Sequence, residues 1–96
     1  METIAVFGPF NGAMQTALKN AIPQLSFRLI FSPEIDQELL RQADYVILRT
    51  LRLDAPEIAL LDRCRLIQRW GAGFDTVDIA AAGKRGIPVA VTAGMN

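Results

Sequence analysis

Residues 66–91 read LIQRWGAGFDTVDIAAAGKRGIPVAV, and this stretch decides the fold. Residues 66–69 open with an apolar pair and are expected to form a short strand, and Gly71-Ala72-Gly73 is a sharp turn after it. Asp78 is placed to cap a helix, and residues 89–91 form another apolar run. The stretch therefore predicts a strand, a helix and a second strand in succession, which is the repeating unit of a parallel sheet.

The same alternation extends upstream to the amino terminus. Further strands are expected at residues 3–7, 25–31 and 45–48, and further helices at residues 13–22, 35–43 and 55–61. Ser32 and Pro33 suit the start of the second helix, Asp54 and Glu57 resemble a capping box for the third, and Gly86 fits the left-handed end of the fourth. The strands are almost continuously apolar, which favours a parallel sheet covered on both faces. We therefore predict an α/β fold, a doubly wound five-stranded parallel sheet of order 2-1-3-4-5, as one domain over residues 1–96.

The end of the chain does not fit a complete domain of this kind. A helix is expected after the fifth strand to cover the sheet, and only residues 92–96 follow that strand. The pattern predicts a domain that is truncated after the fifth strand, with a small domain that ends on a strand as the alternative. The uncovered sheet face is then expected to promote self-association, for example as a dimer.

The composition excludes several classes of partner. Ten basic residues balance ten acidic ones, so nothing favours nucleic acid or an anionic membrane. No apolar run approaches the ~20 residues of a membrane span, and the first residues do not resemble a signal peptide. The single cysteine, Cys64, has no partner within the chain for a disulfide. A cytoplasmic protein is expected.

Ligands of an open α/β sheet bind beyond the carboxyl ends of its strands. The glycines of the turn at residues 71–73 either only shape the turn or also bring backbone amides close to a small anion such as a carboxylate. Arg49 and Arg52 follow the third strand and are candidates to meet an anionic substrate, although a structural role is the commoner one. The chain contains no histidine, which excludes a Ser-His-Asp or Cys-His site and leaves a metal site with little support.

Residues 66–78, LIQRWGAGFDTVD, continuing to GIPV at 86–89 and VTAGMN at 91–96, resemble the amino-terminal part of the D-isomer-specific 2-hydroxyacid dehydrogenases. The stretch ADYVILRT at 43–50 is also similar to the third strand and loop of that family. The resemblance implies a flavodoxin-like substrate-binding lobe, with a separate nucleotide-binding domain that is absent from this chain.

The resemblance also implies site residues and partners. The amides of Ala72 and Gly73 would hold the carboxylate of a small 2-hydroxy or 2-oxo acid, and Arg49 and Thr50 would line the same pocket. Asn96 resembles an asparagine that touches substrate in some members. The catalytic residues and the NAD or NADP site of the family lie beyond position 96, so no cofactor and no catalytic residue is expected in this chain.

Two hypotheses of function follow from these observations. The first is the substrate-binding lobe of an NAD(P)-dependent 2-hydroxyacid dehydrogenase, an oxidoreductase, which is inactive on its own. The second is a free-standing or engineered flavodoxin-like module for binding or interaction, without catalysis. A receiver domain is disfavoured, because Gly8-Pro9 and Arg49-Thr50 stand where its acidic residues are expected.

Overall fold

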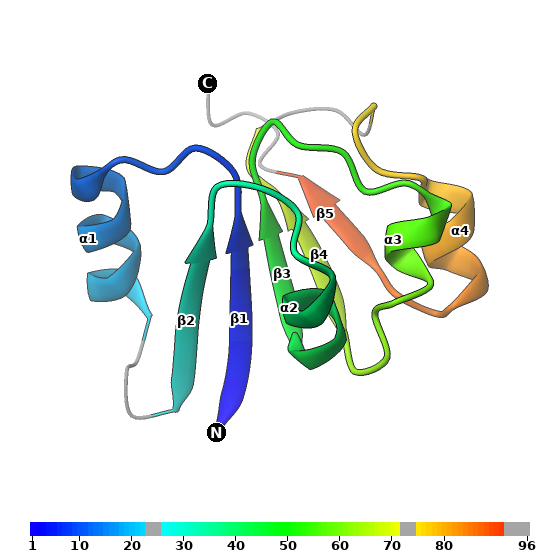
Figure 1. The fold of residues 1–96 in the computed structure, drawn as a ribbon, viewed down its shortest axis with the longest axis horizontal. Helices are drawn as coiled ribbons and strands as arrows, with labels where there is room; N and C mark the ends of the chain where they lie inside the picture. Colours follow the sequence, from blue (N-terminus) through cyan, green and yellow to red (C-terminus); the bar gives the residue numbers. More distant parts are fainter. Residues whose placement is uncertain (23–25, 72–74, 92–96) are drawn as a thin grey trace.

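The computed structural model describes residues 1–22, 26–71 and 75–91. Strands and helices alternate along the chain, as Figure 1 shows. In chain order the elements are β1 (Glu2–Phe7), α1 (Gly12–Ala21), β2 (Phe27–Ser32), α2 (Gln37–Gln42), β3 (Tyr45–Leu48), α3 (Ala55–Ile58), β4 (Leu66–Arg69), α4 (Ile79–Lys84) and β5 (Val89–Val91). In these described ranges no helix is both long and apolar enough to cross a membrane.

The five strands form one parallel sheet in the order β2-β1-β3-β4-β5, which confirms the predicted topology. Ala5 pairs with Ile30 on one side and with Val46 on the other. Val46 in turn pairs with Ile67, and Ile67 with Val89, so the register runs unbroken across the sheet. All carboxyl ends point to one edge (Figure 1), which is where ligands of such sheets bind.

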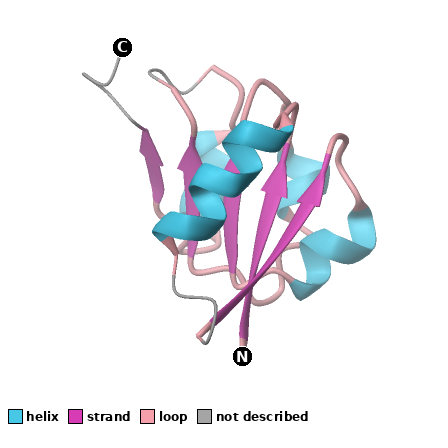
Figure 2. Cartoon of the chain, turned by 90° about the vertical axis from the view of Figure 1, so that its left-hand side faces the viewer, coloured by secondary structure: helices cyan, strands magenta, loops and turns pink. Residues whose placement is uncertain are grey.

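Two apolar clusters lie on opposite faces of the sheet, because successive side chains of a strand alternate in direction. The larger one packs α2, α3 and α4 against the sheet and is centred on Phe7, Val46, Leu48 and Ile67. The smaller one packs α1 against β1, β2 and β3. Both ribbon views place α1 apart from the other three helices (Figures 1 and 2). Among the described elements, three helices therefore cover one face of the sheet and one helix covers the other.

The ends of α4 follow the predicted chemistry. Asp78 is the N-cap, and its side chain accepts a hydrogen bond from an amide in the first turn. Gly86 has a φ of 71° and donates from its amide to Gly83 O at 3.0 Å. The amide of Ile87 donates to Ala82 O at 3.0 Å, which completes a Schellman motif. These caps fix where the helix stops and where β5 begins.

The second helix begins later than predicted. Ser32 was expected to cap it with Pro33 in its first turn, but Ser32 is still the last residue of β2 and pairs with Phe7. The N-cap is Asp36, whose carboxylate accepts a hydrogen bond from Leu39 N at 3.0 Å. A carboxylate at this position satisfies an amide that the helix leaves unpaired, so the helix starts there.

The third helix is shorter than predicted, while its capping residues are as expected. It covers Ala55–Ile58 only and does not continue to Leu61. The Glu57 carboxylate accepts a hydrogen bond from Asp54 N at 2.9 Å, which is the reciprocal half of a capping box. The single turn buries Ile58 against the sheet.

Candidate functional site

The loops after β1, β3 and β4 leave the sheet together at its carboxyl edge. The amide of Arg49 donates to Phe7 O at 2.9 Å, and the amide of Trp70 donates to Leu48 O at 2.7 Å. The parallel hydrogen bonding thus continues one residue beyond β3 and β4. Residues 49 and 70 are therefore held in place by backbone contacts, and the loops begin directly after them.

Gly8 allows the loop after β1 to contact the loop after β3. It has a φ of 125°, a conformation that residues with a side chain rarely adopt. A Cβ built on Gly8 would lie 2.1 Å from the carbonyl oxygen of Arg49. The backbone of Arg49 can therefore approach β1 only because position 8 has no side chain.

Arg49, the first predicted substrate contact, is anchored on the neighbouring loop. Its guanidinium donates to the carbonyl of Pro9 and lies 6.0 Å from the centre of the Phe10 ring. A depression of about 440 Å³ adjoins it, lined by Pro9, Phe10, Asn11, Met14 and Arg49. A guanidinium has five N–H donors, so an arginine held by one carbonyl keeps the capacity to bind an anion.

Thr50, the second predicted contact, occupies an uncommon backbone conformation. Its φ is 62°, and Leu51 N donates across it to Arg49 O at 2.8 Å, which makes a γ-turn. A β-branched residue in this region is a true outlier and costs roughly 1–3 kcal/mol. Strain of this kind concentrates at functional sites, and Thr50 is exposed at the same edge as Arg49.

Two arginines hold the ends of the turn that follows β4. Arg69 donates from Nε to Thr76 Oγ1 at 2.7 Å and from Nη1 to Trp70 O at 2.8 Å. Arg52 donates from Nη1 to Asp75 O at 3.1 Å. Arg52 also pairs with a carboxylate two residues on, at 3.1 Å, so its role here is structural. Sequence reasoning missed Arg69; its only signal was a charged residue at the end of a predicted strand.

The segments after β3 and β4 also pair directly. Leu53 and Val77 form a parallel bridge between them. The amide of Leu53 donates to Thr76 O at 2.8 Å, and the amide of Asp78 donates to Leu53 O at 2.9 Å. Residues that come from separate parts of the sequence are thereby brought together along one border of the candidate site.

Aromatic side chains border the edge on the α1 side. The ring of Trp70 meets the ring of Phe10 edge to face, with centres 5.4 Å apart. Phe10 is buried and meets Phe31 edge to face at 6.1 Å. Trp70 is 40% exposed, so it packs on one side and faces solvent on the other.

Only two of the five predicted substrate-binding residues lie within the described part of the chain. Arg49 and Thr50 lie in the loop after β3 at the carboxyl edge, and their contact with substrate stays a prediction. Ala72, Gly73 and Asn96 lie outside the described residues, and their role in the site stays a prediction.

The first loop of the sheet does not carry the glycine fingerprint of a dinucleotide site. In the first loop, Gly8 accommodates the Arg49 carbonyl, and the side chain of Phe10 belongs to the core. Gly71 opens the turn after β4, which is not the first turn of the sheet, where the dinucleotide fingerprint belongs. Among the described ranges, no three His, Cys, Asp or Glu side chains group as metal ligands.

Solved structures share this fold. The 3-phosphoglycerate dehydrogenase of Entamoeba histolytica, solved with NAD+, has a TM-score of 0.83 and 24% identity over 95% of this chain and 32% of its own. The NAD-dependent formate dehydrogenase of Staphylococcus aureus, solved with NAD, has a TM-score of 0.83 and 22% identity over 96% and 31%. The D-lactate dehydrogenase of Escherichia coli has a TM-score of 0.78 and 20% identity over 94% and 30%. The chain thus spans about a third of the length of these structures.

The family comparison goes further than the shared fold. A search of curated proteins gives no significant match. Residues 4–96, however, match the family described as D-isomer specific 2-hydroxyacid dehydrogenase, catalytic domain. That span includes every described strand and helix except the first two residues of β1. The chain therefore belongs to the D-isomer specific 2-hydroxyacid dehydrogenase family and corresponds to its catalytic domain.

Proposed function

We propose that this chain is the substrate-binding lobe of an NAD(P)-dependent D-2-hydroxyacid dehydrogenase. In this proposal its carboxyl edge binds the carboxylate of a small 2-hydroxy or 2-oxo acid. The observation that carries the proposal is the position of Arg49, which is anchored at this edge in a chain whose residues 4–96 match the catalytic domain.

The substrate carboxylate would be bound by two kinds of donor. Backbone amides of Ala72 and Gly73 would donate to it, and the guanidinium of Arg49 would supply a positive charge nearby. Thr50 and Asn96 would line the same pocket. Charge-assisted hydrogen bonds of this type orient a carboxylate as well as hold it, so the reacting carbon would point away from the sheet.

The arginines that hold the ends of the turn act as positioning residues in this account. Arg69 fixes Trp70 and Thr76, and Arg52 fixes Asp75, so the described residues on either side of positions 72–74 are held in place. A binding site gains affinity when its donors are ordered before the ligand arrives, because less freedom is lost on binding.

The nicotinamide cofactor would be held by another part of the protein. When bound, NAD or NADP supplies or takes up the hydride. Two of the relatives were solved with NAD, which favours NAD for this protein. The chain also has no histidine to serve as the acid–base group. The 96 residues alone would therefore bind substrate without turning it over.

The absence of turnover is tested by NADH and NADPH oxidation with the purified chain. Glyoxylate and hydroxypyruvate serve as 2-oxo acid substrates, and no oxidation above the rate without protein is expected. Reproducible oxidation that copurifies with the 96-residue chain would disprove the proposal that it is a binding lobe only.

A further inference from the structure

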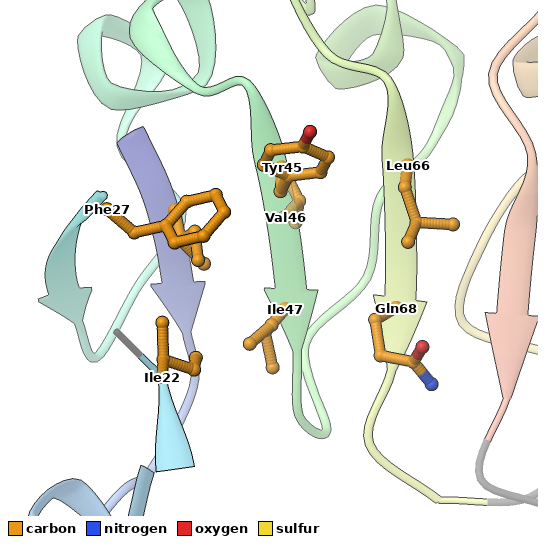
Figure 3. Close-up of a pocket in the computed structure, with 8 residues that line it drawn as sticks. Ile22, Phe27, Tyr45, Val46, Ile47, Leu66 and Gln68 are labelled. Carbon is orange, nitrogen blue, oxygen red and sulfur yellow. The ribbon is translucent and has the colours of Figure 1, made fainter. Parts of the chain in front are cut away.

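The alternation of side chains along β3 and β4 brings two loop residues to the face of the sheet that carries α1. Figure 3 shows Ile47 of β3 and Gln68 of β4 projecting to this side. The parallel hydrogen bonding continues to positions 49 and 70, and side chains two residues apart on a strand share a face. Arg49 and Trp70 therefore extend this face to the carboxyl edge. Both of them contact the ring of Phe10 there.

Four successive residues at the end of β1 and in its loop contact Arg49. Phe7 O accepts a hydrogen bond from the Arg49 amide at 2.9 Å. Gly8 leaves room for the Arg49 carbonyl, which would lie 2.1 Å from a Cβ at that position. The carbonyl of Pro9 accepts a hydrogen bond from the guanidinium, and the ring of Phe10 lies under it, with its centre 6.0 Å away. Arg49 is thus held along its whole length, from the backbone to the charged end.

The ring of Phe10 is itself fixed by two other rings. It is 9% exposed and meets Trp70 and Phe31 edge to face, at 5.4 Å and 6.1 Å between ring centres. A cation over an aromatic ring is attracted by the electrons of the ring, and this attraction occupies none of the five N–H donors of a guanidinium. The contact can therefore orient the guanidinium of Arg49 and leave its donors for an anion.

We propose that Phe10 is a positioning residue, which acts through Arg49 and holds its guanidinium in the orientation that binds the substrate carboxylate. A long arginine side chain loses conformational freedom when it binds a ligand, and a side chain that is ordered in advance loses less. The effect on substrate binding rests on the proposed function, whereas the order of the Arg49 side chain does not.

The test combines two measurements on the isotope-labelled 96-residue chain. The order parameter of the Arg49 Nε–H group, from ¹⁵N relaxation, is expected to be about 0.8 or higher in the parent and below about 0.6 in Phe10→Leu. Pyruvate, titrated at constant ionic strength, should bind Phe10→Leu two- to fivefold more weakly, which is the range of an exposed cation–π contact. Phe31→Leu is the matched control, because it removes a neighbouring ring of the same cluster and should change neither quantity.

A double-mutant cycle separates positioning from a contribution to the core. Arg49→Gln removes the group through which Phe10 is proposed to act. In that background Phe10→Leu should have no further effect on the affinity for pyruvate. The same two- to fivefold loss in both backgrounds would show that Phe10 acts independently of Arg49, and would overturn the proposal.

Circular dichroism shows whether each variant is folded, and Phe10→Met provides a second apolar side chain without a ring. An Arg49 side chain that is flexible in the parent would overturn the proposal without any variant. An order parameter that Phe10→Leu and Phe10→Met leave unchanged, or that Phe31→Leu lowers equally, would overturn it as well. Failure of the parent to bind pyruvate would instead disprove the proposed function, and the order parameters would still decide whether Phe10 positions Arg49.

Discussion

The contact between the loop after β1 and the loop after β3 depends on Gly8. Its backbone conformation and the nearby Arg49 carbonyl both exclude a side chain at this position. Thr50 shows the opposite case, because a β-branched residue is kept in a conformation that favours glycine. Both unusual backbones lie at the candidate site, and neither is visible in a residue-by-residue reading of the sequence.

Gly8→Ala is expected to destabilise the fold by about 3 kcal/mol, through strained backbone and displacement of the Arg49 carbonyl. Gly12→Ala is the matched control, because a Cβ there meets no atom within 4 Å and alanine favours the helix. The control should stay within about 1 kcal/mol of the parent. Denaturant unfolding measures both, and equal stability of the two variants would contradict the role given to Gly8.

The shifted pKa of the Cys64 thiol makes the stability of the folded chain depend on pH in the alkaline range. Burial raises the pKa of this thiol, and the nearby Asp44 raises it further. Hydrogen bonds with the backbone of Leu66 and Val46 lower this pKa, but the net shift is upward. The unfolded chain therefore loses the thiol proton at a lower pH than the folded chain does. The stabilisation is complete below the ordinary thiol pKa of about 8.5 and is lost as the pH rises through the folded value.

The free energy of unfolding, measured under reducing conditions, should therefore fall between neutral and alkaline pH. Cys64→Ala removes this group, so the variant should show a smaller decrease over the same range. If the parent and the variant changed in parallel, the half-buried Cys64 thiol would not be the cause.

At the scale of elements, the sequence predicts most of what the structure contains. Three strands have the predicted bounds: Tyr45–Leu48, Leu66–Arg69 and Val89–Val91. The first and third are uninterrupted apolar runs, as is usual for buried parallel strands, while Leu66–Arg69 ends in two polar residues. The predicted start of α2 was wrong because two capping signals lie close together, at Ser32 and Asp36. Pairing of β2 with β1 holds Ser32 in the sheet, and a contact made by a distant strand cannot be read from local sequence.

The cap of α4 gives a prediction at this scale. Asp78→Ala removes the side chain that accepts from Ala81 N at 2.9 Å and should cost about 1 kcal/mol. Asp78→Asn keeps an acceptor in the same place and should cost much less. Thermal unfolding of the two variants distinguishes them, and a similar loss for both would mean that the charge of Asp78 matters more than its hydrogen bond.

At the scale of the whole molecule, the topology decides which loops meet. The order β2-β1-β3-β4-β5 brings the loops after β1, β3 and β4 to one edge, and this much follows from the alternation of elements. The side-chain contacts at that edge do not follow from it. The hydrogen bond of Arg49 to Pro9 and those of Arg69 to Thr76 and Trp70 join positions whose pairing depends on the folded geometry. The sequence therefore predicts where the site lies better than how it is held.

The measurement that tests the central claim most directly is a titration of the isotope-labelled chain with pyruvate, followed by amide chemical shifts. We expect millimolar or weaker binding, with the shifted amides clustered at Arg49, Thr50 and the turn at residues 71–73. Pyruvamide, which keeps the 2-oxo group and lacks the carboxylate, should leave the chemical shifts of these amides unchanged. Shifts of equal size with pyruvamide, or pyruvate shifts confined to residues away from this edge, would contradict the assignment of the edge as a carboxylate site.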